Sequence, residues 1–440
     1  MSTRAAARPS PWPALGFTLL ALAIALLAYL LAGLGKRGHV PATAALYGST
    51  FTVGYLAAWF ATRRLAPAAD PALFPTAAVL VGIGFAMIFR LSGGLAAEQA
   101  TWIALGLVAF CATLLLVRDH RQLDAYTYTI GLAGLVLLLL PIVPGIGREI
   151  NGARLWVRLG PIGFQPSELG KVFIAVFLAS YLTQKRELLR VATRSIGPLR
   201  LPPAKHLMPV LLAWVASLAI LFLQRDLGAS LLYFGVFVVM LWVAAGRIAY
   251  LAVGAVLFAI GAWLGYRAFE HVQLRVDVWL HALDPDKVFA QGYGQLAQAW
   301  FGMGTGGLVG TGLGRGSPGL IPFAATDFIF AAIGEELGLL GTVAVLLLYV
   351  TLVGKALRTA LACPDAFGRL LATGLATTVA LQTFVIVGGI TRVIPLTGVT
   401  LPFVSYGGSS LVSNFILLAL LVRIDAGPAP NDGRRLRRRA

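Results

Sequence analysis

The sequence predicts an all-α membrane protein that crosses the bilayer many times, and three observations support this class. Only 12% of the 440 residues are charged, compared with about 25% in an ordinary soluble domain. The mean hydropathy is +0.83. Apolar stretches of about 20 residues, the length of a membrane-spanning helix, recur along the chain and leave no room between them for a sizeable soluble domain.

These apolar stretches predict twelve spanning helices. The first follows Arg4 and Arg8, but it is too long for a signal peptide and lacks a small-residue cleavage pattern, so we interpret it as a membrane anchor. Arg225 and Asp226 mark the joint between the seventh and the eighth. The predicted helices cover residues 13–34, 41–61, 71–89, 99–117, 126–143, 166–184, 206–223, 226–244, 248–268, 326–354, 370–390 and 401–423.

The basic residues predict the orientation of these helices. The formal net charge is +17, and the Lys and Arg residues cluster in short connections and in the tails. By the positive-inside rule both termini are cytoplasmic, with Lys36 and Arg37 as exceptions. We therefore expect plasma-membrane lipids of the inner leaflet, and not nucleic acid, as the partner of this charge. The largest clusters are Lys185, Arg186, Arg190, Arg194, Arg200 and Lys205, and Arg434, Arg435, Arg437, Arg438 and Arg439.

Two long connections face the outside in this orientation, at about 144–165 and 269–325. The second contains an apparently helical piece, Val288 to Phe301, followed by the glycine-rich stretch "GMGTGGLVGTGLGRGSPG". This stretch matches G-x-G-x-x-G formally, but it lacks the flanking strand, the helix and the acidic residue of a dinucleotide site. We expect a flexible or closely packed loop that lets backbone approach a ligand.

The first outer loop carries the motif "NGARLWVRLGPIGFQPSELGK". Arg154, Trp156 and Arg158 alternate, so an extended segment points all three to the same side. Guanidinium groups suit phosphate oxygens, and an indole ring can stack on a sugar. An interfacial Trp between snorkelling arginines explains the pattern as well, and both interpretations stay open.

Several charged residues lie at or near membrane depth. Lys171 follows Glu168 by one helical turn, which fits either a functional site or an ordinary i,i+3 ion pair. Arg225 and Arg392 lie at the predicted outer edge of the membrane. Several cations at the same depth in the membrane suggest an anionic ligand there. An ion pair between Arg225 and Asp226 at a helix break explains Arg225 equally well.

The stretch "PFAATDFIFAAIGEELG", residues 322–338, places three carboxylates at the mouth of an apolar run. Asp327 is at the rim, where capping a helix would be a sufficient role. Glu335 and Glu336 lie two turns deeper, about 12 Å along the axis. At that depth they must be paired, protonated or lining a wet cavity. We expect a polar cavity that opens outward, with Lys171 as a counter-charge for one glutamate.

The available side chains limit the chemistry of such a cavity. No serine–histidine–acid set can be assembled, and Cys111 and Cys363 fall in different environments, so no disulfide or metal site is predicted. Asp327 could act as a general base toward a hydroxyl, and nearby cations could hold a phosphate leaving group. Because nucleotide-activated sugars are not at hand outside the cytoplasm, a glycosyl donor there would be activated by a lipid pyrophosphate.

Five separated motifs resemble the SEDS family (shape, elongation, division and sporulation), the RodA and FtsW group. The chain resembles this family over about residues 71–423. The motifs are "NGARLWVRLGPIGFQPSELGK", "QRDLGAS", "GMGTGGLVGTGLG", "TDFIFAAIGEELGLLG" and "IPLTGVTLPFVSYGGSSL", in the family's order.

The resemblance implies a peptidoglycan polymerase that joins lipid II units beside a class B penicillin-binding transpeptidase. The family's essential aspartate matches Asp327, which would deprotonate the acceptor hydroxyl so that undecaprenyl pyrophosphate leaves with inversion. The family's functionally sensitive tryptophan in the first large outer loop matches Trp156, and its lysine within the membrane matches Lys171. No cofactor is evident, and a divalent cation on the pyrophosphate is chemically reasonable. The expected substrate-binding residues are Arg154, Trp156, Arg158, Lys171, Arg225, Gln298, Glu335, Glu336, Arg392 and Ser409.

The chain also departs from the family pattern. Phe323 and Ala325 replace a Glu and a His before Asp327, Arg225 replaces a Pro, and Gly294 splits the motif that contains Gln298. The family core has ten spans, which leaves two additional helices. The expected organisation is a cytoplasmic tail (1–12), two additional helices (13–70), the polymerase core (71–423) and a basic cytoplasmic tail (424–440).

Two other function classes fit parts of this pattern. A lipid II flippase would use the polar cavity as a path for the head group, and a non-catalytic scaffold would support the transpeptidase. Asp327 at the outer rim fits the enzyme better than the flippase. The "GGITRVIPLTG" segment favours a role in elongation and cell shape over one in division.

Overall fold

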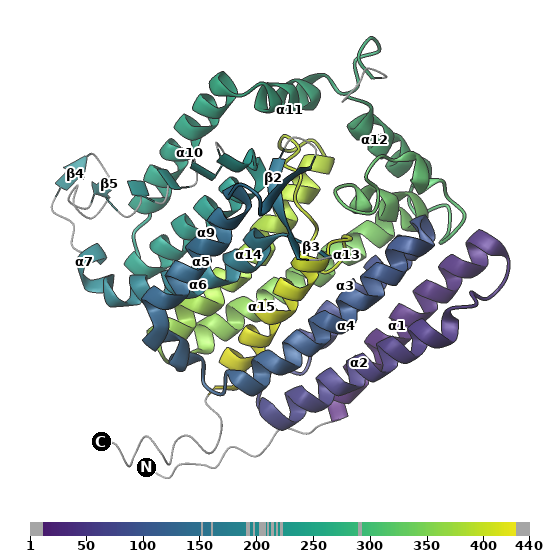
Figure 1. Cartoon of the computed structure of the whole chain (residues 1–440), viewed down its shortest axis with the longest axis horizontal. Helices are drawn as coiled ribbons and strands as arrows, with labels where there is room; N and C mark the ends of the chain where they lie inside the picture. Colours follow the sequence, from purple (N-terminus) through teal and green to yellow (C-terminus); the bar gives the residue numbers. More distant parts are fainter. Residues whose placement is uncertain are drawn as a thin grey trace.

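The computed structural model describes residues 12–427 except for short gaps. It forms one helical bundle (Figure 1). Its long helices are α1 (Trp12–Arg37), α2 (Ala44–Leu65), α3 (Leu73–Leu91), α4 (Gly93–Leu116), α5 (Thr127–Leu139), α6 (Pro166–Gln184), α9 (Leu227–Ala245), α10 (Ala249–Ala268), α13 (Ile329–Ala362), α14 (Ala366–Ile390) and α15 (Gly408–Ala426). The gaps are 151–152, 160–161, 191–193, 197–198, 202–207, 209–210, 213–214, 217–218, 221–222 and 289–292.

Within this described part, nine helical segments are long and apolar enough to cross a membrane, which agrees with the predicted class. One of them, His120–Ile142, joins α5 to the 3₁₀ helices η1 (His120–Tyr126) and η2 (Leu140–Ile142). Helices α2 and α6 are also long, but they fall outside this set. Most of the predicted span 206–223 lies outside the described residues. The tenth predicted span begins at Ile329, and the last begins at Gly408, later than expected.

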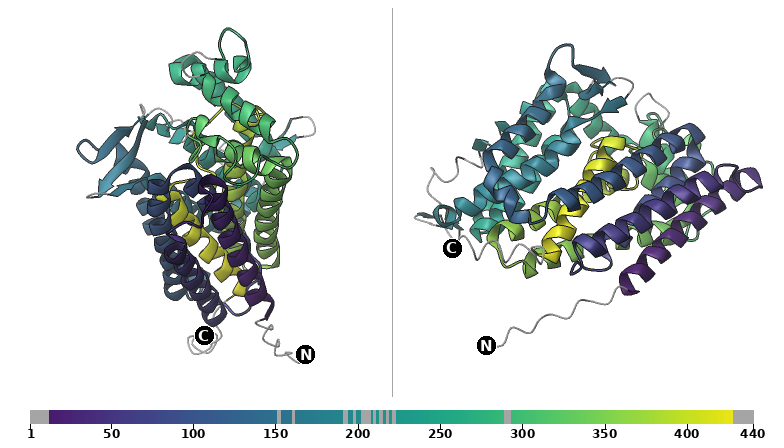
Figure 2. Two further views of the ribbon diagram at one scale, coloured as in Figure 1. Left: turned by 90° about the vertical axis from the view of Figure 1, so that its right-hand side faces the viewer. Right: turned by 60° about the horizontal axis from the view of Figure 1, so that its bottom comes forward.

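The bundle has two distinct ends. The start of α1 and the end of α15 lie at one end, which we call the tail end (Figures 1 and 2). The opposite end, which we call the loop end, carries two shorter helices, α11 (Glu270–His281) and α12 (Gly294–Gly306). Helix α12 covers the later part of the predicted piece Val288–Phe301, whereas α11 was not predicted.

The first connection at the loop end is a small antiparallel sheet. Its strand order is β1 (Gly147–Ile150), β2 (Ala153–Leu159) and β3 (Ile162–Phe164). A second hairpin, β4 (Arg194–Ile196) with β5 (Leu199–Leu201), follows the short helix α7 (Arg186–Arg190).

Small residues set the closest helix contacts. A Cβ at Gly82 of α3 would lie 2.3 Å from the Cβ of Ala25 in α1, so only glycine permits this approach. Gly408, at the start of α15, faces the indole of Trp102 in α4 in the same way, as expected for the small residues of the "SYGGSS" motif. Helix α13 breaks at Gly338, where φ is +68°. This break admits the glycine-rich loop described below.

Candidate active site

The position of Asp327 is fixed by the "LPFVSYGGSS" segment. Asp327 lies two residues before α13, in a tight turn where the backbone N–H of Thr326 donates to the carbonyl of Phe323 at 3.0 Å. The hydroxyl of Ser405 donates to the carbonyl of Thr326 at 2.6 Å, and the N–H of Tyr406 donates to the carbonyl of Ala325 at 2.8 Å. The two residues before Asp327 are therefore tied to the segment that precedes α15.

Asp327 lines a cavity of about 200 Å³ at the loop end. Arg275 of α11 and Gln295 of α12 supply its other long polar side chains, and Thr397 and Gly398 form its floor. The guanidinium of Arg275 donates to the carbonyl of Leu396 at 2.9 Å, so this segment holds it in place. Gly398 has φ +77°, and a Cβ there would lie 3.2 Å from Arg275, so both backbone and space favour glycine.

The electrostatics of this cavity suit a carboxylate that exchanges a proton. Burial raises the pKa of Asp327 to about 6, and the nearby Arg275 and the Thr326 side chain limit the rise. A general base works best when its pKa lies near the operating pH. In addition, the buried hydroxyl of Thr397 has no hydrogen-bond partner among the described residues, so it is free for a ligand.

A long apolar groove adjoins the Asp327 cavity. A cavity of about 330 Å³ between α9, α10 and the 394–397 segment shares Arg275 and Thr397 with it. A second cavity of about 340 Å³ between α9, α10 and α14 continues this path, because both are lined by Phe234, Phe258 and Ile394. The groove therefore runs along the spanning helices and ends beside a carboxylate and a guanidinium.

Lys171 lies in a separate polar pocket, so its expected pairing with Glu335 or Glu336 is wrong, whereas the i,i+3 pair with Glu168 is present. Its ammonium group donates to Glu168 at 2.6 Å and to the side-chain carbonyl of Gln382 at 2.9 Å. The pocket is about 40 Å³ and also contains Asp226, which caps the start of α9. Gly398 lines both this pocket and the Asp327 cavity, so the two are separated by one segment of backbone.

Glu335 and Glu336 are buried and bind the glycine-rich loop. The prediction that they share a cavity with Asp327 is therefore wrong. Glu336 accepts from Arg90 of α3 at 2.8 Å and from the N–H of Gly314 at 2.9 Å. Glu335 accepts from the N–H of Ser317 at 2.5 Å. The loop is packed closely against the break in α13, since the N–H of Leu339 donates back to it at 2.9 Å.

Arg154, Trp156 and Arg158 lie on β2, and their positions agree with the expected alternation. Arg154 and Arg158 are exposed and Val157 between them is buried. Arg154 pairs with Glu149 of β1 at 3.3 Å. None of the three lines the Asp327 cavity, which α11, α12 and α14 form with the 396–398 segment.

Arg225 and Arg392 have left-handed backbone conformations at helix ends. Arg225 is exposed. Arg392 donates to the carbonyls of Trp279 and Leu280 at 3.0 and 3.1 Å, so it binds the end of α11 instead of facing the cavity.

Ser409 and Gln298 also lie outside the cavity. The hydroxyl of Ser409 accepts from the N–H of Gln165, which joins the start of α15 to the start of α6. Gln298 is exposed, whereas Gln295, one turn earlier in α12, lines the cavity. Gln298, the glutamine expected to bind substrate, is therefore not the one that lines the cavity.

Arg275 is the functional candidate that the sequence did not predict. In "EHVQLRVDVWLH", residues 270–281, apolar and polar residues alternate from Val272 to Val278. Alternation is the pattern of a strand, yet the segment is helix α11 and packs across the loop end. The only feature of the sequence that could have indicated Arg275 as a functional residue was its positive charge in the longest outer connection.

The chain matches the family profile described as cell cycle protein (FtsW/RodA/SpoVE) over residues 72–428. It belongs to this family. The SEDS family suggested by the motifs is therefore confirmed, and the chain is a multi-pass membrane protein.

Relatives in this family are similar over most of their length. The chain is 45% identical over 400 residues to the peptidoglycan glycosyltransferase RodA of Mycobacterium tuberculosis, covering 88% of this chain and 84% of the relative. It is 33% identical over 369 residues to a probable peptidoglycan glycosyltransferase FtsW of Geobacter metallireducens, covering 81% and 94%.

Two solved structures show the same fold. A chain of a peptidoglycan synthase complex that coordinates polymerization and crosslinking matches with a TM-score of 0.64 and 31% identity, covering 81% of this chain and 97% of that one. The rod shape determining protein RodA of Thermus thermophilus matches with a TM-score of 0.55 and 29% identity, covering 81% and 96%.

Proposed function

We propose that this protein is an inverting peptidoglycan glycosyltransferase that polymerises lipid II at the outer face of the bacterial plasma membrane. One observation carries the proposal: Asp327 and Arg275 line a cavity that adjoins an apolar groove along the spanning helices. A lipid-linked sugar diphosphate needs such a site, because its chain belongs in the bilayer and its head group in water.

The orientation follows from the charge distribution. The loop end faces outward and both termini are cytoplasmic, with about twelve spanning helices: a core of ten and the additional pair α1 and α2. The connections 144–165 and 269–325 then lie outside the membrane. A membrane-impermeant maleimide should label a cysteine introduced at Asp286, in the second connection, from the outside of intact cells.

The two charged groups of the cavity, Asp327 and Arg275, each have a role in the proposed reaction. The Asp327 carboxylate accepts the proton of the GlcNAc 4-hydroxyl of the acceptor, and the oxygen attacks the anomeric carbon of the donor MurNAc. The bond from that carbon to the diphosphate breaks, and undecaprenyl pyrophosphate leaves. Arg275 stabilises the charge that develops on the leaving group.

The proposed partner is a class B penicillin-binding transpeptidase, which would crosslink the emerging strand during elongation. A solved relative that matches this chain belongs to a complex that combines polymerization and crosslinking. The relatives named RodA favour elongation over division.

The deciding experiment combines the purified full chain, its transpeptidase and lipid II, and reads glycan polymer on a gel. We expect Asp327→Asn to lower the polymerisation rate by about 10²–10⁴-fold, the contribution of a general base. The matched control is Asp286→Asn, which removes an exposed carboxylate from the connection that precedes Asp327 and should leave the rate unchanged.

Polymer made at the normal rate by Asp327→Asn would reject this aspartate as the base. Absence of polymer with the unmodified chain would reject the proposal that the protein is a glycosyltransferase. If dye-labelled lipid II then crossed the leaflets of liposomes, the protein would be a flippase; if it did not, the protein would act as a scaffold.

A further inference from the structure

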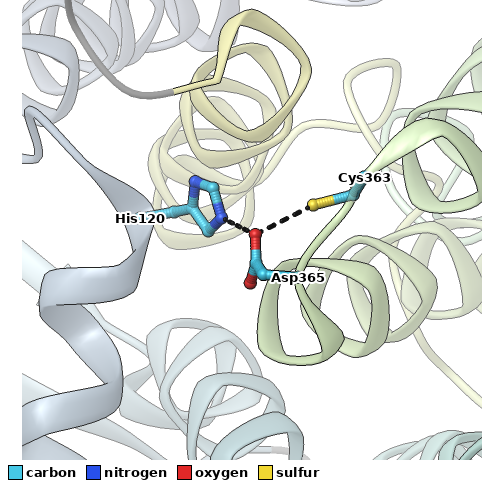
Figure 3. A group of neighbouring side chains, drawn as sticks. All are labelled: His120, Cys363 and Asp365. Atoms are coloured by element: carbon cyan, nitrogen blue, oxygen red, sulfur yellow. Dashed lines mark hydrogen bonds and ion pairs between the residues drawn. The ribbon is translucent and has the colours of Figure 1, made fainter. Parts of the chain in front are cut away.

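A second cluster of reactive side chains lies at the tail end, at the opposite end of the bundle from Asp327. His120 begins η1, while Cys363 and Asp365 lie in the connection between α13 and α14 (Figure 3). The Nε2 of His120 donates to an oxygen of Asp365 at 2.8 Å, and the Cys363 thiol donates to the same oxygen at 3.2 Å. The reaction proposed above uses none of these groups.

The cluster has the composition and spacing of a metal site. One nitrogen of His120, the Cys363 sulfur and one Asp365 oxygen all lie within 4.8 Å of one another. In a tetrahedral zinc site, ligand atoms lie about 2.0–2.3 Å from the metal and hence about 3.3–3.6 Å apart. The observed 2.8 and 3.2 Å would need to lengthen by a few tenths of an ångström. Both distances end on Asp365, the partly exposed member of the three, so a rotation of its side chain can supply the change.

Gly368 leaves space where these three atoms meet. A Cβ at this position would lie 2.6 Å from the Cys363 sulfur, 2.6 Å from the His120 nitrogen Nε2 and 3.0 Å from the Asp365 oxygen. Its φ is not in the left-handed region, so conformation alone does not require glycine here. Glycine is needed here because a Cβ would occupy the point on which the three donor atoms converge.

The second nitrogen of His120 lies near a carboxylate, as is common for histidines that bind metals. His120 is 1% exposed, and its Nδ1 has no hydrogen-bond partner in the described part of the chain. An oxygen of Asp119 lies 3.7 Å away. A ligating histidine usually donates its other N–H to a carboxylate, and a small rotation of Asp119 would complete this pair.

Two features of the cluster disfavour the binding of a cation, namely the nearby positive charge of Arg121 and the protonated thiol of Cys363. Arg121 lies 3.8 Å from Asp365 and 3.9 Å from Asp119. Burial, together with the hydrogen bond to Asp365, raises the pKa of Cys363 to about 11, so metal binding must displace the thiol proton. Once that proton is lost, the thiolate and Asp365 neutralise a divalent cation, and Asp119 is left to balance Arg121.

We propose that His120, Cys363 and Asp365 bind one Zn²⁺ ion, with water as the fourth ligand and Asp119 as the partner of the histidine. The ion would join η1 to the α13–α14 connection, segments far apart in the sequence. Asp365 also caps α14 by accepting from the N–H of Gly368 at 2.7 Å, so the site would fix the tail end of this helix.

The test uses the full chain in lipid nanodiscs, stripped with a chelator and titrated with Co²⁺ as a spectroscopic substitute for zinc. We expect about one Co²⁺ per chain, with a thiolate-to-cobalt charge-transfer band that Zn²⁺ removes by competition. Cys363→Ser should abolish the band. Asp119→Asn should keep the band and weaken binding by about 10–100-fold, as loss of a histidine's partner does.

Two further variants complete the experiment. Cys111→Ser, which removes the other cysteine, should leave the titration unchanged. Gly368→Ala keeps every donor and fills the space between them, so it should lose the band even if Cys363→Ser does not fold. Absence of stoichiometric binding by the unmodified chain, or a band that survives both Cys363→Ser and Gly368→Ala, would overturn the proposal.

Discussion

Asp327 and the Glu335–Glu336 pair lie within ten residues of one another, yet their surroundings differ completely. Asp327 precedes α13 and faces a cavity that it shares with Arg275. The glutamates lie inside α13, are almost fully buried, and bind Arg90 and the backbone of the glycine-rich loop. One carboxylate is therefore available for chemistry, whereas the other two hold the structure beside it.

The difference shows that a buried charge has to be interpreted through its partners. A carboxylate whose oxygens already accept hydrogen bonds from a guanidinium and a backbone N–H is poorly available to a substrate. One that is buried without such an ion pair has a raised pKa and can exchange a proton. Variants on each side of this comparison should consequently change different quantities.

The largest expected effect is on stability, at Glu336. Glu336→Gln leaves the largely buried Arg90 without its charged partner, and breaking a buried pair costs about 3–5 kcal/mol. The free energy of unfolding in detergent, measured by denaturant titration, should fall by that amount. Glu149→Gln is the matched control, because its exposed pair with Arg154 contributes about 0–1 kcal/mol. An equal, small change in the free energy of unfolding for both variants would show that the Glu336–Arg90 pair does not stabilise the fold.

Arg275 should affect the reaction and not the fold. Arg275→Gln removes a charge aimed at the leaving group, and loss of one such donor lowers the rate by about 10²–10³-fold. The polymer gel assay measures this loss, and a melting curve checks that the variant stays folded. Arg392→Gln is a useful comparison, because Arg392 binds α11 outside the cavity. Wild-type polymerisation by Arg275→Gln would exclude it from the site.

The pH dependence of Asp327 should have opposite signs for rate and stability. Its pKa is raised from 3.8 to about 6 by burial, so the base form is lost below pH 6 and the rate should fall about tenfold per pH unit there. Because the folded pKa lies above the unfolded value, the stability contribution of Asp327 is complete below 3.8 and is lost as pH rises through 6.

Two variants check this assignment. Asp327→Asn should remove the stability step near pH 6. Since Arg275 lowers the pKa of Asp327, Arg275→Gln should move the inflection of the residual rate to higher pH. A pH–rate profile with no inflection between pH 5 and 7 (around the value of about 6) would contradict Asp327 as the titrating base.

The smallest expected effect distinguishes two glutamines of α12. Gln295 lines the cavity and Gln298 is exposed. Gln295→Ala should lower the rate by about 2–10-fold, the value of one hydrogen bond, and Gln298→Ala should leave it unchanged. The reverse ranking in the gel assay would show that the substrate lies on the other face of α12.

Much of the fold and one site residue could be predicted because they depend on local sequence. The apolar stretches, the extended Arg154–Arg158 segment and the position of Asp327 before a helix follow from composition and periodicity. The local Glu168–Lys171 pair could also be anticipated from its i,i+3 spacing. The long-range partners could not be predicted in this way. Lys171 also binds Gln382, and Glu336 binds Arg90, residues up to 246 positions apart in the chain.

The sequence by itself determined that this chain is a membrane-spanning helical protein with a carboxylate before one of its helices. Transfer of each apolar stretch into the bilayer depends on that stretch alone, so hydropathy suffices. Tertiary structure decided which charges meet. Helix α11 carries Arg275 to Asp327, and the break at Gly338 brings the glycine-rich loop to Glu336, because ion pairing depends on the distance between segments and not on their order in the chain.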